Sequence, residues 1–165
     1  MEHKFGIFNT VEELNRAAAA QKAEGDAEAL IALAEENGLD REDAEDYLDG
    51  SVEELATPVV AALGKLELEA RELKLESQLA DWKDFVAAMC TESEEMSRAV
   101  FLPDKHLEDV LAEALKHASK NRIRLPEILT RKAGIPDGSS IGMTDRGDLR
   151  RIAEAYYLGK EGGGR

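Results

Sequence analysis

Residues 57–89 read TPVVAALGKLELEARELKLESQLADWKDFVAAM, and this stretch decides the fold. The threonine and proline at its start are typical of a helix start. Threonine caps the first turn, and proline is tolerated there because the backbone N–H that it lacks would have no partner within the helix. Apolar residues then recur at helical spacing over 59–73, and a second apolar stripe runs over 75–89. The second stripe is rotated from the first. The stretch therefore predicts one long helix with changing neighbours, or a helix pair that breaks near Ser77.

The sequence on both sides of this stretch also predicts helices, whose ends are marked by capping residues. The expected N-caps are Thr10, Asp26, Asp40, Thr91, Asp104 and Thr144, and a short helix is expected at 126–132. Alternation of apolar and polar residues is everywhere too brief to predict a strand, and residues 5–8 are only a weak candidate. Residues 138–143 are expected to form a loop. We therefore expect an all-α protein, an irregular multi-helix bundle around one long central helix or helix pair.

Length and composition bound the organisation of the chain. Its 165 residues, 43% of them apolar, can form one compact core with an appendage. We expect an acidic short-helix region at 1–56, a helical core at 57–159 and a disordered tail at 160–165. Cys90 is the only cysteine, so no internal disulfide can form and a reducing compartment is expected. The start of the chain does not look like a signal peptide, and the longest apolar run is far too short for a membrane span, so we expect a soluble, cytoplasmic protein.

Negative charge is concentrated in the first part of the chain. The formal net charge is −14, and the first hundred residues hold 25 acids against 9 bases. Such a surface repels polyanions and attracts basic partners, so we expect no contact with membranes or nucleic acid. The densest run predicts a surface that binds a basic protein partner, the alternative being a solvated helical face. Its ten acids are Glu35, Glu36, Asp40, Glu42, Asp43, Glu45, Asp46, Asp49, Glu53 and Glu54.

A basic cluster lies in the second part of the chain, with six bases against one acid over 116–132. The bases are Lys116, Lys120, Arg122, Arg124, Arg131 and Lys132. Aromatic residues for base stacking are not interleaved with them, which argues against nucleic-acid binding. Pairing with the acidic segment, inside the chain or between subunits, is the favoured interpretation. Which of the two charged segments contacts a partner stays open at this point, and we also expect that the chain can form homo-oligomers.

Three motifs are candidates for a metal-binding or catalytic site. An EF-hand loop counted from Asp40 would need glycine and glutamate where Glu45 and Ser51 stand, which excludes it. Residues 138–142 match G-x-S-x-G around Ser140, but a nucleophile elbow requires a preceding strand of a parallel sheet. His106, Glu113 and His117 are spaced along one helix without the Glu-x-x-His pairs of bundle metal sites. With Cys90 expected in the core, we expect no enzyme activity, no cofactor and no metal.

Several stretches resemble small proteins carried on mobile elements of gut Firmicutes, a group that includes Cas9-inhibiting anti-CRISPR proteins. The resemblance covers roughly the first two-thirds of the chain and a terminal Tyr-Tyr-Leu-Gly, and it is carried by residues 4–15, 36–49, 56–58 and 156–159. It implies a stoichiometric, non-enzymatic inhibitor that blocks a CRISPR nuclease. The acidic run suits the mimicry of nucleic acid, because such nucleases hold nucleic acid in a positively charged channel. The alternative is a helical accessory or scaffolding protein of a mobile element that self-associates through the apolar stripes between Leu63 and Met89.

Overall fold

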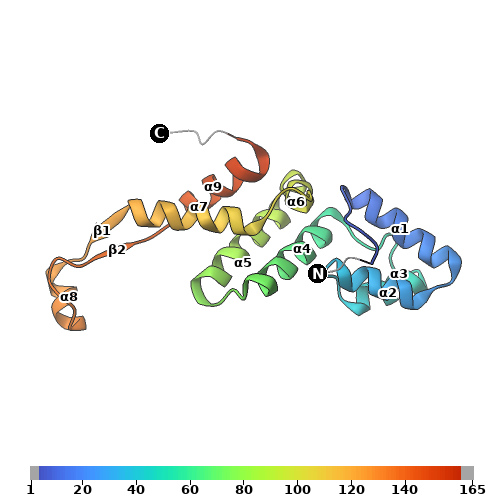
Figure 1. Ribbon diagram of the computed structural model, residues 1–165, viewed down its shortest axis with the longest axis horizontal. Helices are drawn as coiled ribbons and strands as arrows, with labels where there is room; N and C mark the ends of the chain where they lie inside the picture. Colours follow the sequence, from blue (N-terminus) through green and yellow to red (C-terminus); the bar gives the residue numbers. More distant parts are fainter. Residues whose placement is uncertain (1–3, 161–165) are drawn as a thin grey trace.

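The protein is an elongated assembly of helices with a projecting arm, as a computed structural model describes it over residues 4–160 (Figure 1). Those residues are 68% helical, and the predicted all-α fold is confirmed. Residues 161–165 of the expected tail lie outside the described residues. The helices are α1 (Val11–Glu24), α2 (Ala27–Glu36), α3 (Arg41–Asp49), α4 (Pro58–Leu73), α5 (Ser77–Glu92), α6 (Glu94–Phe101), α7 (Leu107–Lys120), α8 (Glu127–Ala133) and α9 (Arg146–Leu158).

The stretch that decides the fold forms a helix pair, so the break near Ser77 is present. Helix α4 begins with Thr57 as N-cap, whose side chain accepts a hydrogen bond from the amide of Val60. It ends at Lys74, which adopts a left-handed conformation with φ 52°. Helix α5 then begins at Ser77 and packs back against α4. The two rotated stripes belong to two helices.

Capping residues predicted most helix starts, and three of the predicted positions need correction. Thr10, Asp26 and Asp40 occupy their expected N-cap positions. Helices α6 and α7 are instead capped at Ser93 and His106, two residues later than expected. Helix α9 is capped at Asp145, one residue later than expected. Residues 51–55 form bends and no helical turn, although they carry a capping-box pattern. Residues 5–8 form no strand.

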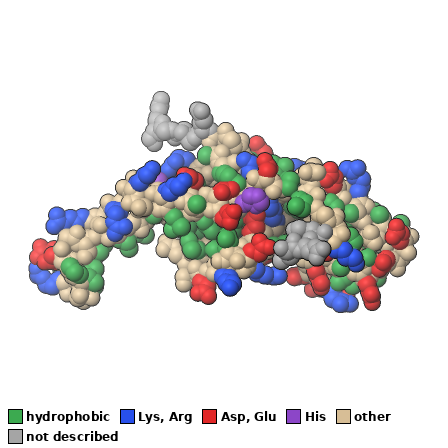
Figure 2. Space-filling model, in the orientation of Figure 1, with side chains coloured by type: hydrophobic (Ala, Val, Ile, Leu, Met, Phe, Trp, Pro, Cys, Tyr) green, Lys and Arg blue, Asp and Glu red, His purple; other side chains and the backbone are tan. Residues whose placement is uncertain are grey.

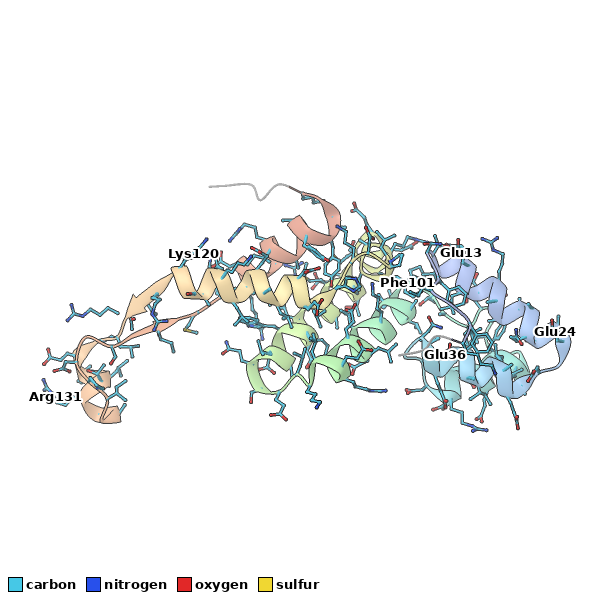
Figure 3. All side chains as sticks on the ribbon, viewed as in Figure 1. Glu13, Glu24, Glu36, Phe101, Lys120 and Arg131 are labelled. Carbon is cyan, nitrogen blue, oxygen red and sulfur yellow. The ribbon has the colours of Figure 1, made fainter. Side chains whose placement is uncertain are left out.

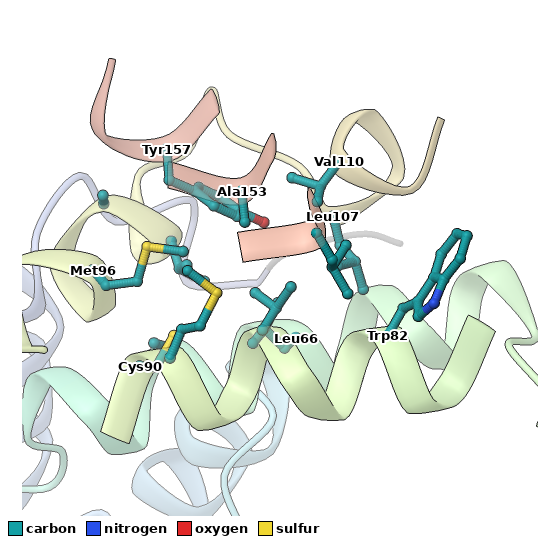
Figure 4. Packing of buried hydrophobic residues seen from close by; sticks show 14 of the residues in the cluster. Leu66, Trp82, Cys90, Met96, Leu107, Val110, Ala153 and Tyr157 are labelled. Carbon is teal, nitrogen blue, oxygen red and sulfur yellow. The ribbon is translucent and has the colours of Figure 1, made fainter. Parts of the chain in front are cut away.

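Two hydrophobic cores lie side by side along the molecule. The first holds residues of α1, α2, α3 and the start of α4, together with Phe101. The second holds residues of α4, α5, α6, α7 and α9, among them Leu66, Trp82 and Leu107 (Figure 4). Helix α4 therefore belongs to both cores. The division of the chain into 1–56 and 57–159 stays a prediction.

Two glycines bring the first core close to α4. Gly38 ends the turn after α2, and Gly64 lies in the middle of α4. A Cβ atom at Gly64 would stand 2.5 Å from the carbonyl oxygen of Asn37, which is closer than van der Waals contact permits. Only glycine allows the two backbones to approach in this way. This close approach brings the turn between α2 and α3 against the middle of α4.

Residues 121–143 form an arm that leaves the body after α7 and returns before α9 (Figure 1). Strands β1 (Arg122–Arg124) and β2 (Ser140–Gly142) pair antiparallel, with Ile123 opposite Ile141, and α8 lies beyond them at the tip. The sequence did not predict these strands, because each has three residues and β1 is exposed along its whole length.

Candidate functional site

The ten acids of the predicted partner-binding run lie on α2, α3 and the following loop, at the end of the molecule opposite the arm (Figures 1 and 2). Seven of them are exposed: Glu35, Asp40, Glu42, Glu45, Asp49, Glu53 and Glu54. Glu36, Asp43 and Asp46 are half-buried. The ten acids thus lie in one part of the molecule, but they differ in what each carboxylate is free to do.

Several of these carboxylates serve the local fold. Asp43 accepts a hydrogen bond from the backbone amide of Asp40 at 2.9 Å and completes a capping box at the start of α3. Glu36 accepts hydrogen bonds from the backbone amides at residues 4 and 5. Glu45 pairs with Arg41 at 2.8 Å. These contacts hold the segment in shape and leave part of the acidic run for a partner.

Four carboxylates of the run surround one shallow groove of about 290 Å³, which we call the acidic groove. Asp43 and Asp46 come from α3, and Glu53 and Glu54 come from the loop that leads to α4. The apolar part of the groove is formed by Val52, Leu55 and Val60. Within residues 4–160, Asp46, Glu53 and Glu54 take part in no salt bridge. A lysine or arginine side chain fits such a place, because its stem is apolar and its head is cationic.

Asp49 stands beside the groove and shows how this loop is fixed. Its carboxylate accepts hydrogen bonds from the hydroxyl and the backbone amide of Ser51, at 2.5 and 2.8 Å. These bonds favour the ionised form and lower the pKa of Asp49. Asp49 therefore stays charged at neutral pH while it holds the turn that carries Glu53 and Glu54.

The basic cluster does not pair with the acidic run inside the molecule, which corrects the favoured interpretation. Its bases lie on the C-terminal half of α7 and on the arm, whereas Glu36 lies toward the opposite end (Figure 3). Lys116 pairs with Glu113 at 2.5 Å, and Arg131 pairs with Glu127. Arg122 donates a hydrogen bond from Nε to the hydroxyl of Ser140 at 2.9 Å. Pairing between subunits is the part of that interpretation which stays open.

The motifs set aside in the sequence occupy ordinary structural places. Ser140 lies in β2 and accepts the hydrogen bond from Arg122. Cys90 is fully buried, and burial raises the pKa of its thiol to about 11. His106 caps α7 beside Glu69, whereas His117 lies in the last turn near Thr144 and Asp148. Over residues 4–160 no three His, Cys, Asp or Glu side chains gather closely enough to hold a metal ion.

A charged pair on α4 is the feature that the sequence analysis missed. Lys65 and Glu69 line a cavity of about 210 Å³ between the two cores, together with His106. Lys65 donates hydrogen bonds to the carbonyl oxygens of Val100, Leu102 and Lys105. Glu69 accepts a hydrogen bond at 3.0 Å from the amide of Leu107. The signal was a lysine and a glutamate spaced i, i+4 along an apolar helix, although nothing in the sequence told which main-chain groups they would meet.

Burial shifts the pKa of both members of this pair. It lowers the pKa of Lys65, against the attraction of Glu69, and it raises the pKa of Glu69, against the hydrogen bond from Leu107. All three ammonium protons of Lys65 are used on carbonyl oxygens of the α6–α7 connection. We therefore assign the pair to holding α6 and α7 together, and not to binding a ligand.

Comparison with known proteins assigns no family, since the chain matches no protein-family model, no curated protein and no solved structure. In the described part of the chain, no helix has both the length and the apolar character that crossing a bilayer requires.

Proposed function

We propose that this protein is a non-enzymatic binding protein whose acidic segment, residues 35–54, contacts a basic surface on a partner protein. The observation that carries the proposal is the acidic groove, in which four carboxylates surround an apolar floor at one end of the molecule. Three of them form no salt bridge within residues 4–160. A net charge of −14 adds long-range attraction for a basic surface.

The class of target follows from the resemblance stated above. A Cas9-type nuclease holds nucleic acid in a positively charged channel and reads the flanking motif with arginines. Carboxylates fixed on α3 and on the loop before α4 would stand where phosphates lie, so an anti-CRISPR inhibitor that mimics nucleic acid is the function we propose. Such an inhibitor acts by occupying the channel, so its effect requires one copy of the protein for each copy of the nuclease.

The alternative is an accessory or scaffolding protein of a mobile element that acts by self-association. The stripes expected to mediate it pack inside the molecule, since Leu66, Val86 and Met89 are all buried in the second core. A scaffold would need another apolar surface. The arm supplies one, since it exposes Ile128 and Leu129.

The test of the proposed function is a charge reversal at the groove. A triple variant with Asp46→Lys, Glu53→Lys and Glu54→Lys leaves the capping residue Asp43 in place. We expect it to lose about tenfold or more in affinity for a Cas9–guide complex, and to lose inhibition of cleavage. Binding by the parent should weaken with added salt, because exposed charges are screened over roughly 10 Å at about 0.1 M ionic strength.

The matched control reverses three exposed acids elsewhere, with Glu24→Lys, Glu72→Lys and Asp104→Lys. It changes the net charge by the same amount as the groove variant, so it separates the groove from total charge. We expect the control to inhibit as the parent does. Equal losses in both variants, or a parent that fails to bind the nuclease at low salt, would remove the groove as the contact surface.

A further inference from the structure

The arm exposes apolar side chains to a degree found nowhere else in the described residues. Of the eleven large hydrophobic residues that are exposed between residues 4 and 160, six belong to the 23 residues of the arm. These six are Ile123, Ile128, Leu129, Ile135, Ile141 and Met143. No residue of the arm belongs to either hydrophobic core. Surface of this kind marks an interaction site, because isolated apolar residues are common on proteins but concentrated ones are not.

The arm is a built element with internal contacts. Thr130 of α8 is fully buried, and its hydroxyl bonds to the carbonyl oxygen of Glu127 at 3.0 Å and to the carboxylate of Asp137 at 2.9 Å. The backbone amide of Leu125 donates to the carbonyl oxygen of Ser139 at 2.9 Å, which extends the pairing of β1 and β2. Helix α8 is therefore held on the tip of the arm with Ile128 and Leu129 facing solvent.

The arm is also basic. Its 23 residues hold four bases, Arg122, Arg124, Arg131 and Lys132, and two acids. Figure 2 shows Lys and Arg side chains together with hydrophobic ones along the arm. Both acids and one of the bases are engaged within the arm, since Glu127 pairs with Arg131 and Asp137 bonds to Thr130. A partner that covers the arm must therefore offer apolar surface with acidic groups around it.

The same chain offers a surface of that composition on its body. A groove of about 670 Å³, here called the α5–α9 groove, runs between α5 and the residues that begin α9. Trp82, Phe85, Ala88 and Leu149 give it an apolar side. Asp81, Asp84 and Asp145 line it together with one base, Arg146. Asp84 also pairs with Lys83 at 2.8 Å, and Asp145 caps the start of α9. In charge and in apolar character, the groove complements the arm.

We propose that the arm docks in the α5–α9 groove of a second copy of this chain, and that the exchange is reciprocal. Reciprocal exchange makes a closed two-fold dimer, in which the same two surfaces are covered on both copies. A second copy is favoured over a different protein because the arm and its complement are present on one chain and the arm does not occupy its own groove here. The inference does not depend on the acidic groove, which lies at the other end of the molecule.

Sedimentation velocity of the full chain over a wide concentration range tests the proposal. We expect a dimer in the parent, and a dissociation constant raised by about tenfold or more in the arm variant Ile128→Ser/Leu129→Ser. The groove variant Asp81→Lys/Asp84→Lys should weaken the dimer similarly. The control Ile7→Ser/Leu73→Ser, at exposed apolar residues outside the arm, should dimerise as the parent does. Circular dichroism of each variant confirms that the helices persist.

Mixing the two weakened variants gives a sharper result. The groove variant still has a native arm, and the arm variant still has a native groove, so a mixed dimer keeps one of the two contacts. We expect the mixture to associate more strongly than either variant alone. A monomeric parent at every concentration, or a mixture no stronger than its components, would overturn the proposal.

Cross-linking identifies which copy receives the arm. Cys90 is fully buried and its thiol has a pKa of about 11, so cysteines introduced by Leu129→Cys and Ala88→Cys are the reactive ones under mild oxidation. We expect a disulfide-linked dimer, and none when Ala112→Cys replaces the groove cysteine. A cross-link within one chain would overturn the second copy as the occupant.

Binding of labelled duplex DNA to a monomeric parent, abolished by the arm variant, would assign the arm to nucleic acid instead.

Discussion

Lys65 and Glu69 show how two side chains of one helix can complete the facing ends of two others. Helix α6 ends at Phe101, and its last carbonyl oxygens have no partners within the helix. The ammonium group of Lys65 takes up those of Val100 and Leu102, and it also reaches Lys105 in the connection to α7. Glu69, one turn further along α4, receives the first amide of α7. The α6–α7 connection is thus held by two charged residues of a third helix.

Lys65→Met tests this role. Methionine fills a similar volume but leaves three carbonyl oxygens without a donor and Glu69 without its neighbouring cation, so we expect a loss of about 2–4 kcal/mol in the free energy of unfolding. Chemical denaturation measures the change. The control Lys120→Met, at an exposed position at the end of α7, should stay within about 0.5 kcal/mol of the parent. Equal stability of the Lys65 and Lys120 variants would show that water satisfies the carbonyl groups equally well.

At the scale of the element, the break between α4 and α5 is made by residues that are not glycine. Lys74 and Ser77 both adopt positive φ angles, 52° and 51°. The left-handed conformation is unfavourable for a residue with a Cβ atom, and glycine is the usual residue at such a helix end. The helix pair therefore keeps its turn in spite of its local sequence, through the packing of α5 against α4.

Lys74→Gly should consequently stabilise the protein. Relief of the left-handed strain at the end of α4 outweighs the added freedom of glycine in the unfolded chain, and we expect a gain of about 0.5–1 kcal/mol. Thermal and chemical unfolding give the measurement. Lys74→Ala keeps the Cβ atom and should bring no gain. If alanine stabilised as much as glycine, the effect would have to come from the lost lysine charge.

The elements that the sequence predicted are those whose ends carry local signals. Thr10, Asp40 and Thr57 mark helix starts through side-chain chemistry that acts within one turn, so they could be recognised without knowledge of the rest of the fold. The strands of the arm could not, since Arg122–Arg124 pairs with a distant segment, Ile123 opposite Ile141, and three residues are too few for a recognisable alternation. The later start of α9 has a similar cause, because Thr144 is buried and donates its hydroxyl to the carbonyl oxygen of Ala114.

The candidate sites also differ in how much of them the sequence could predict. Composition alone pointed to the acidic run, but only the fold shows that Glu53 and Glu54 meet Asp43 and Asp46 around one groove. The exposed apolar surface of the arm was invisible in the sequence, because Ile128 and Leu129 sit in a helix whose apolar residues would ordinarily be buried. Exposure depends on what a helix packs against, and that is decided by long-range contacts.

At the scale of the whole molecule, the acidic groove and the arm lie toward opposite ends, with the second core between them (Figure 1). A partner at one end leaves the other end accessible. Under our two proposals the same chain would bind a nuclease with α3 and a second copy with its arm, so a dimer would present two acidic grooves. Reversal of the groove and disruption of the arm should therefore affect inhibition and dimerisation separately.

Because α4 contributes to both cores, neither core can melt without exposing part of the other. Ala61 packs in the first core and Ala62 in the second, one residue apart on the same helix. We expect one calorimetric transition, with a calorimetric enthalpy close to the van't Hoff value. Trp82, the only tryptophan, is buried in the second core, so its fluorescence should report the melting of the whole chain. A ligand bound in the acidic groove would then raise the melting temperature measured by the fluorescence of Trp82, although this side chain lies in the other core. Trp82 fluorescence can therefore report binding at the acidic groove without an added label.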